Sequence, residues 1–143
     1  MTRSPDTTPT RNDEGLRVLI IDDEPFHAET IAEVLERVGY HCTVATSGTE
    51  GARKLDQEDF DVVLTDLKMG DLDGLTILRK VKQDSPDSLV VLITGHGDVR
   101  TAVEAFKQGA YDYLTKPLDM AELRALMDKA AERLQLARDN REL

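Results

Sequence analysis

The sequence predicts an α/β fold in which helices cover both faces of a five-stranded parallel sheet. Five short apolar runs alternate with segments whose apolar residues recur every three to four positions. This alternation is typical of parallel strands joined by crossover helices. Neither the GxGxxG nor the GxxxxGK[ST] phosphate loop occurs, so the dinucleotide-binding and P-loop folds have no support. We therefore predict a doubly wound sheet of strand order 2-1-3-4-5, with its switch point between strands one and three.

The composition and the hydrophobic periodicity of the sequence indicate where the folded domain and its strands lie. Residues 1–15 show no hydrophobic period and are rich in Thr, Pro and Asp, which predicts a disordered leader. The domain is expected over residues 16–135. Its strands are expected in the runs RVLII, CTVAT, DVVLT, LVVLIT and YDYLT.

Each strand is followed by a helical pattern. The first helix ends at Gly39, the second is short and follows Ser47, the third stops before Pro86, and the fourth begins at the N-cap Asp98. The side chains expected to face the sheet are Ile31, Val34, Leu35 and Val38 in the first helix, Leu75, Leu78 and Val81 in the third, and Val99, Ala102, Val103 and Phe106 in the fourth.

The last helix begins at Asp119 and runs to the end of the sequence without a Gly or Pro. A 3-4 spacing of its apolar positions predicts a coiled-coil seam and a parallel homodimer. The seam residues are Leu123, Met127, Ala130, Leu134 and Ala137. We expect residues 136–143 to be a helical linker to an output domain outside this sequence; the alternative is a fraying surface helix.

Composition and charge limit the kind of protein. The chain has 143 residues, of which 40% are hydrophobic, and this fits one domain with a substantial core. The net charge of −10 argues against direct nucleic-acid binding, which needs clustered Lys and Arg, and fits a protein that binds a cation. No apolar stretch reaches the roughly 20 residues that span a bilayer, and no secretory signal is evident, so we expect a cytoplasmic protein without membrane contact. The single cysteine, Cys42, excludes an internal disulfide, and we expect a buried structural thiol.

Polar side chains follow four of the five predicted strands. Asp22 and Asp23 come after the first, Asp66 after the third, Thr94 after the fourth and Lys116 after the fifth. The carboxyl ends of parallel strands meet at one edge of the sheet, so these side chains should lie together there. Each alone has an ordinary explanation as a helix cap, a turn or a strand exit. Together they favour a pocket for phosphoryl transfer.

Three carboxylates in one crevice need a countercharge, because like charges a few ångströms apart repel by several kcal/mol. Mg²⁺ prefers carboxylate oxygens, retained water and a substrate phosphate, which fits Asp22, Asp23 and Asp66, with Mn²⁺ as an alternative. Between this cation and Lys116, a carboxylate can attack a phosphorus atom whose oxygens are neutralised. The expected product is an aspartyl phosphate that accepts a hydrogen bond from the Thr94 hydroxyl.

Four motifs give the chain a family resemblance. They are IIDDE at 20–24, LTDLKMGDLDG at 64–74, ITGHGD at 93–98 and YLTKP at 113–117. In their order and spacing the chain resembles a response-regulator receiver domain of bacterial two-component signalling, over roughly residues 16–135. The resemblance implies a flavodoxin-like fold, and the 2-1-3-4-5 order is known from this family.

The resemblance also implies a role for each site residue. Asp66 would be the phosphoacceptor, Asp23 would bind Mg²⁺ directly and Asp22 partly through water. The backbone carbonyl of Lys68 would complete the protein ligands, and Lys116 would contact the phosphoryl group. Thr94 and Tyr113 would form the switch pair, and the bond before Pro117 would be cis.

The function implied is a phosphorylation switch rather than an enzyme. A sensor histidine kinase would donate the phosphoryl group, and the surface of the fourth helix, fifth strand and fifth helix would change with it. The stretch VRTAVEAFKQGAYDYLTKP is similar to receivers of sigma-54-dependent transcription activators, in which the last helix leads to an AAA+ ATPase. Two alternatives are a phosphate-independent dimerisation module and an aspartyl-phosphate hydrolase, although the hydrolase usually needs an acid where Lys68 stands.

Two residues depart from the family pattern. Gly70 stands where the family usually has Pro, so we expect a more mobile loop and a less preorganised Mg²⁺-binding carbonyl. Lys68 projects a charge near the phosphoryl site and is expected to change the lifetime of the aspartyl phosphate, unless it is simply a solvated surface lysine.

Overall fold

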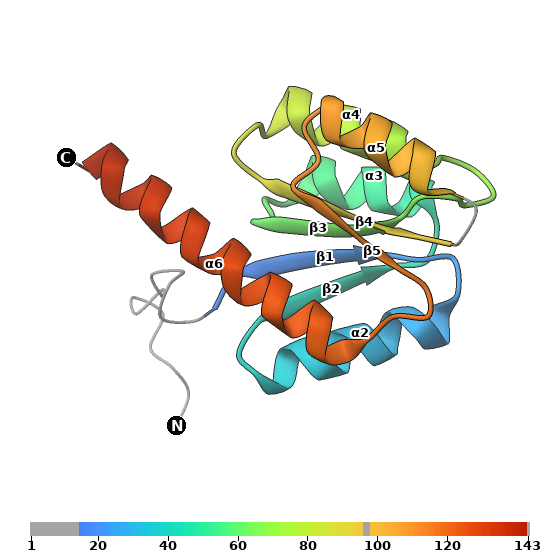
Figure 1. Cartoon of the computed structure of the whole chain (residues 1–143), viewed down its shortest axis with the longest axis horizontal. Helices are drawn as coiled ribbons and strands as arrows, with labels where there is room; N and C mark the ends of the chain where they lie inside the picture. The colour runs from blue at the N-terminus through green and yellow to red at the C-terminus, as the bar shows by residue number, and fades with distance from the viewer. Residues whose placement is uncertain (1–14, 96–97, 143) are drawn as a thin grey trace.

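The structure is a computed structural model that describes residues 15–95 and 98–142. The predicted leader lies outside the described residues except for Gly15. Strands and helices alternate along the whole described chain (Figure 1). The elements are β1 (Arg17–Ile21), α2 (Pro25–Arg37), β2 (His41–Ala45), α3 (Gly48–Gln57), β3 (Val62–Asp66), α4 (Gly74–Asp84), β4 (Leu89–Thr94), α5 (Val99–Lys107), β5 (Asp112–Thr115) and α6 (Met120–Glu142).

The five strands form one parallel sheet of order β2-β1-β3-β4-β5, which confirms the predicted topology. Ile21 pairs with Thr65, and Asp66 pairs with Ile93. The carboxyl ends of β1, β3 and β4 therefore lie level at one edge of the sheet. The residues that follow these strands come together there.

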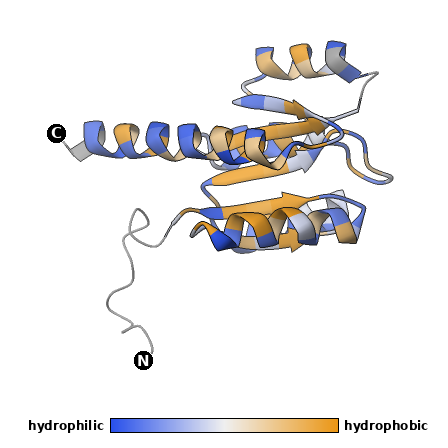
Figure 2. Ribbon diagram, turned by 60° about the horizontal axis from the view of Figure 1, so that its bottom comes forward, coloured by the Kyte–Doolittle hydropathy of each residue, from blue (hydrophilic) through white to orange (hydrophobic). Residues whose placement is uncertain are grey.

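Two hydrophobic clusters cover the two faces of the sheet. Val18 and Ile20 pack with α2 and α6, whereas Leu19 and Ile21 pack on the side of α3, α4 and α5. Successive residues of β1 thus point to opposite buried faces, as in a parallel sheet covered on both sides. Figure 2 shows the mostly hydrophobic strands between helices that carry hydrophilic outer faces. No described helix is both long and apolar enough to cross a membrane.

Helix α5 differs from its predicted packing. Val103 and Phe106, expected to be buried, are 48% and 41% exposed, whereas Ala102 and Ala105 are buried. Among the described side chains of α5, the buried ones are the small residues Ala102 and Ala105, and the Phe106 ring contacts the Tyr113 ring of β5 edge-on at 5.7 Å. The side chain of Val99 lies outside the described part of the chain.

Two further expectations need correction. Val38 is 43% exposed, because α2 ends at Arg37 and the chain turns away at Gly39, where φ is +104°. Cys42 is only partly buried, since β2 is an edge strand of the sheet. Burial and the nearby Glu36 still raise the pKa of the Cys42 thiol to about 12.

The predicted dimer seam is wrong for its first half. Leu123, Met127 and Ala130 are completely buried in the core cluster beneath the sheet. The 3-4 spacing therefore marks the face of α6 that packs on its own domain. Leu134 packs partly buried at the margin of that cluster, and Ala137 is exposed where α6 extends past the sheet (Figure 1).

Candidate functional site

Three carboxylates meet at the carboxyl edge of the sheet. Asp22, Asp23 and Asp66 each offer an oxygen, and these oxygens lie within 4.8 Å of one another. Asp22 continues β1, because its N–H donates to the Ala45 carbonyl at 3.0 Å, and Asp66 is the last residue of β3. Asp22 is fully buried and Asp66 is 2% exposed, whereas Asp23 is open to solvent. The cluster therefore has a buried floor and one accessible side.

The carboxylate of Asp22 is held by its own segment of chain. One oxygen accepts the Glu24 N–H at 2.9 Å, and the other contacts Nδ1 of His27 in the first turn of α2. Sequence reasoning did not assign His27 to this site. The available signal was a histidine one helical turn beyond the acidic pair.

Asp66 lacks such partners. Lys116 Nζ lies 3.0 Å from one of its oxygens, and beyond this ion pair no described residue donates a hydrogen bond to either oxygen. The buried hydroxyl oxygen of Thr94 also has no partner among the described residues. Buried polar atoms are normally satisfied within a protein, so the second Asp66 oxygen and the Thr94 hydroxyl, both without a partner at the same edge, indicate a site for a ligand. Hard carboxylate oxygens without protein donors fit a divalent cation such as Mg²⁺.

The electrostatics of the pocket support the same fit. Burial raises the pKa of Asp66 to about 7, and the neighbouring Asp22 carboxylate acts in the same direction, whereas Lys116 opposes it. Burial lowers the pKa of Lys116, but the carboxylates of Asp66 and Asp22 outweigh burial and raise it. Lys116 thus stays charged, and Asp66 needs more positive charge than Lys116 supplies in order to ionise freely.

Comparison with known proteins identifies the family. The family model "Response regulator receiver domain" matches residues 18–128. The chain belongs to this family. The transcriptional regulatory protein ZraR of Escherichia coli (strain K12) is 37% identical over 117 residues, which are 82% of this chain and 26% of ZraR. The DNA-binding transcriptional regulator NtrC of Klebsiella pneumoniae is 39% identical over 116 residues, which are 81% of this chain and 25% of NtrC.

The receiver fold is also found among solved structures. A response regulator receiver domain protein from Clostridium thermocellum superposes with a TM-score of 0.82 at 38% identity, over 86% of this chain and 99% of that one. The match therefore covers nearly the whole length of the Clostridium thermocellum receiver domain protein. This chain spans about a quarter of the length of ZraR and NtrC.

The two residues expected to form the switch pair lie on the same face of the receiver sheet. Tyr113 pairs with Leu92, and Thr94 lies two residues beyond Leu92 on the same strand, so both point towards α5. Tyr113 is partly buried, and its neighbour Phe106 is partly exposed. The Lys116–Pro117 peptide bond, at the other side of the pocket, is cis.

The loop that follows Asp66 carries the remaining predicted ligand, the Lys68 carbonyl. The Leu67 N–H donates to the Ile93 carbonyl at 2.9 Å, and the Gly74 N–H closes the loop on Leu67 at 2.7 Å. The Lys68 side chain is exposed and pairs with Asp98 at 3.0 Å. Asp98 is the N-cap residue of α5, as predicted, but its side chain makes no capping hydrogen bond and instead pairs with Lys68.

Proposed function

We propose that this receiver domain is a switch that accepts a phosphoryl group on Asp66. The observation that carries the proposal is a buried carboxylate whose one protein partner among the described residues is Lys116, at 3.0 Å from one oxygen, and which faces two further carboxylates. Asp22, Asp23, Asp66 and the Lys68 carbonyl would hold Mg²⁺ or Mn²⁺. The cation, when bound, supplies positive charge that offsets the phosphoryl oxygens.

The chain's own residues then have distinct tasks. One oxygen of the ionised Asp66 forms the new O–P bond, while the bond from phosphorus to the donor breaks and its electron pair leaves with the donor. Lys116, which is charged, stabilises the negative charge on the transferred group. The unpartnered Thr94 hydroxyl donates a hydrogen bond to a phosphoryl oxygen.

Phosphorylation would change the surface over α5, β5 and α6. The aspartyl phosphate adds roughly two negative charges and draws the Thr94 hydroxyl inward. The space left by Thr94 lets the Tyr113 ring turn from its partly exposed position to a buried one. Because the Tyr113 ring contacts Phe106, this rotation moves an exposed apolar residue of α5.

The wider setting follows from the relatives. ZraR and NtrC are named as transcriptional regulators, and the matched segment covers about a quarter of each. We therefore propose an attached transcription-activating output domain of the sigma-54-dependent kind. A sensor histidine kinase would be the phosphoryl donor, and the receiver would act in the cytoplasm. This acidic segment itself would not bind DNA. We place a homodimer contact on α6 beyond Ala130, around Leu134 and Ala137.

Substitution of Asp66 tests the switch directly. The wild type and Asp66→Asn are incubated with a small acyl phosphate, with and without Mg²⁺, and the bound phosphoryl group is measured by intact-mass spectrometry. We expect Mg²⁺-dependent labelling of the wild type and none of Asp66→Asn. Asp59→Asn, which alters an exposed carboxylate at the opposite end of the sheet, should label like the wild type. Labelling of Asp66→Asn would contradict the proposal.

Light scattering tests the dimer separately. Beryllofluoride mimics the aspartyl phosphoryl group, and a change of mass with Mg²⁺ and beryllofluoride in the wild type but not in Asp66→Asn would support a phosphorylation-controlled dimer. Ala137→Glu places a charge on the exposed part of α6 and should abolish that change. A constant mass in every sample would contradict control of a dimer by this segment.

A further inference from the structure

The loop after Asp66 is fastened to a neighbouring helix by one side chain. The carboxylate of Asp71 accepts the Gly48 N–H at 2.9 Å and the Thr49 N–H at 2.8 Å. These groups begin α3, where backbone N–H groups have no partner within the helix and a negative charge is favourable. The hydrogen bonds from Thr49 and Gly48 hold the pKa of Asp71 well below its usual range. Asp71 is therefore a charged N-terminal cap of α3 that comes from a distant part of the chain, 22 residues after Thr49.

Asp71 does not duplicate the local cap of α3. Ser47 accepts the Glu50 N–H at 3.0 Å, and the Glu50 side chain accepts the Thr46 N–H at 2.7 Å. The pair forms a variant of the capping box, in which Glu50 reaches the residue before the Ser47 cap instead of the cap itself. This box leaves the N–H groups of Gly48 and Thr49 for the acceptor loop. The two caps complete the first turn of α3 from different parts of the chain.

The loop backbone also packs closely on α3. A Cβ added at Gly48 would lie 2.4 Å from the Leu72 carbonyl oxygen and 2.6 Å from the Leu72 Cβ. Only glycine permits this approach. Asp71 and Leu72 are thus held against α3, whereas a Cβ at Gly70 would meet nothing within 4 Å.

We propose that Asp71 is a positioning residue for the phosphoryl site, because its bonds to α3 fix the loop that carries the Lys68 carbonyl. The inference rests on the proposed function, in which that carbonyl is a Mg²⁺ ligand. The loop is anchored at Leu67 by the Ile93 carbonyl and at Asp71 by α3, so only three residues, 68–70, span the two anchors. Asp71 therefore supplies by hydrogen bonding the restraint that a proline ring at position 70 supplies by fixing φ. With this restraint in place, the presence of Gly70 instead of Pro is no longer a reason to expect a mobile loop.

Mg²⁺ affinity, measured by isothermal titration calorimetry, tests this role. We expect Asp71→Ala to weaken Mg²⁺ binding by about tenfold, the lower range for groups that orient metal ligands. Asp71→Asn keeps one acceptor oxygen and should lose less. The matched control is Asp73→Ala, which removes a carboxylate cap from the same loop, where Asp73 accepts the Thr76 N–H at 2.9 Å, but this cap is local to α4. Asp73→Ala should lower the melting temperature and leave the Mg²⁺ affinity within twofold of the wild type.

Rescue by proline separates positioning from simple stability. Gly70 has a φ outside the left-handed region, a Cβ added there would meet nothing within 4 Å, and its N–H donates no hydrogen bond within the described residues, so we expect Pro to be tolerated there. Gly70→Pro added to Asp71→Ala should restore most of the lost affinity. Equal losses in Asp71→Ala and Asp73→Ala, an unchanged affinity in Asp71→Ala, or no rescue by proline would each overturn the inference. A wild type that binds no Mg²⁺ would overturn the proposed function together with it.

Discussion

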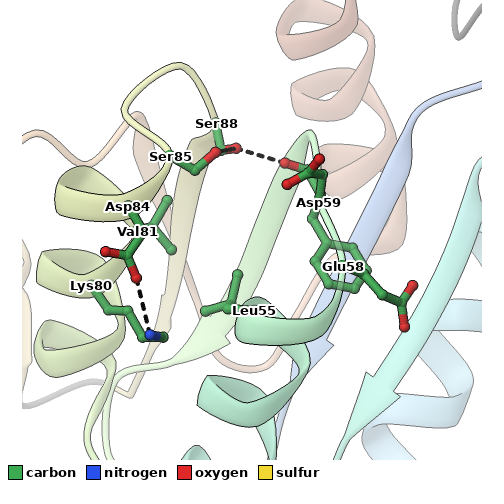
Figure 3. Close-up of a pocket in the computed structure, with 9 residues that line it drawn as sticks. Leu55, Glu58, Asp59, Lys80, Val81, Asp84, Ser85 and Ser88 are labelled. Atoms are coloured by element: carbon green, nitrogen blue, oxygen red, sulfur yellow. Dashed lines mark hydrogen bonds and ion pairs between the residues drawn. The ribbon is translucent and has the colours of Figure 1, made fainter.

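The two ends of the sheet differ in how far their buried polar side chains are satisfied by hydrogen bonds within the protein. At the amino ends of β3 and β4, the Ser88 hydroxyl donates to the Phe60 carbonyl at 2.6 Å and lies 2.7 Å from the Ser85 hydroxyl, beside a small pocket (Figure 3). At the carboxyl ends of the same strands, the Thr94 hydroxyl has no hydrogen-bond partner among the described residues, and the Asp66 carboxylate has only the ion pair with Lys116. Satisfied groups stabilise a fold, and unsatisfied ones are kept where a ligand will complete them. We therefore expect the polar groups of the amino end to contribute to stability and those of the carboxyl end to bind a ligand.

This comparison predicts that removing a charge at the carboxyl end stabilises the metal-free protein. The folded-state pKa of Asp66 is about 7, against 3.8 for the free side chain, and about three pKa units correspond to up to about 4 kcal/mol. Because the pKa of Asp66 is raised on folding, the contribution of Asp66 to the stability of the wild type falls as the pH rises from about 4 to about 7. Asp66→Asn has no carboxylate to ionise at this position and should not show this decrease. The difference in unfolding free energy between Asp66→Asn and the wild type, measured by urea unfolding in the presence of EDTA, should therefore grow from about pH 4 to about pH 7 and stay constant at higher pH.

Asp59→Asn is the matched control for that experiment, because Asp59 is an exposed carboxylate at the amino end. Its unfolding free energy should follow the wild type at every pH within about 0.5 kcal/mol. An Asp66→Asn variant that is no more stable than the wild type at pH 8 would mean that the carboxyl end carries no strain from its buried charge.

Loss of the cation at the carboxyl end should impair phosphoryl transfer. Lys116→Gln removes the charge 3.0 Å from Asp66, and we expect the rate of phosphorylation by a small acyl phosphate to fall about a hundredfold. Lys80→Gln removes a lysine at the other end and should leave the rate unchanged. A similar fall in both variants would point to loss of folded protein rather than loss of charge stabilisation.

The sequence predicted the carboxyl end better than it predicted the helix faces, for a physical reason. Asp22, Asp66 and Lys116 each follow a buried strand, and parallel strands can deliver such residues to only one edge. The periodicity of apolar residues, by contrast, shows which face of a helix is apolar but not which part of the protein, or of a partner, packs against that face. The apolar face of α6 with Leu123 and Met127 therefore resembled a dimer seam until the fold placed it under the sheet.

The contacts made by loops could not be predicted from the sequence, for a different reason. The bonds from Asp71 to α3 and from His27 to Asp22 depend on where the chain turns after each strand, and no periodic pattern encodes this. Gly70 alone pointed to a mobile loop. The hydrogen bond between Asp71 and Gly48, which are 23 residues apart, is the basis for our proposal that the loop is restrained instead.

At the amino end, removing a paired hydroxyl should cost stability and leave function intact. Ser88→Ala deprives the buried Phe60 carbonyl of its donor, and we expect the free energy of unfolding to fall by about 1–2 kcal/mol. Phosphorylation of the variant should proceed at the wild-type rate. Ser85→Ala, which leaves the bond to Phe60 in place, should cost less, and the reverse order would show that Phe60 does not depend on Ser88.

The smallest effect is expected at the ion pairs of the amino end. Lys80 pairs with Asp56 at 2.7 Å and with Asp84 at 3.0 Å, and both carboxylates are more than half exposed. Water and salt screen such pairs, so Lys80→Gln should change the unfolding free energy by less than about 1 kcal/mol, and by still less in 1 M salt. Thermal unfolding at low and high salt measures this difference. A larger loss that salt does not reduce would mean that the Lys80 stem stabilises the amino end by packing over Val81 and Leu55 in the pocket of Figure 3, rather than by its charge.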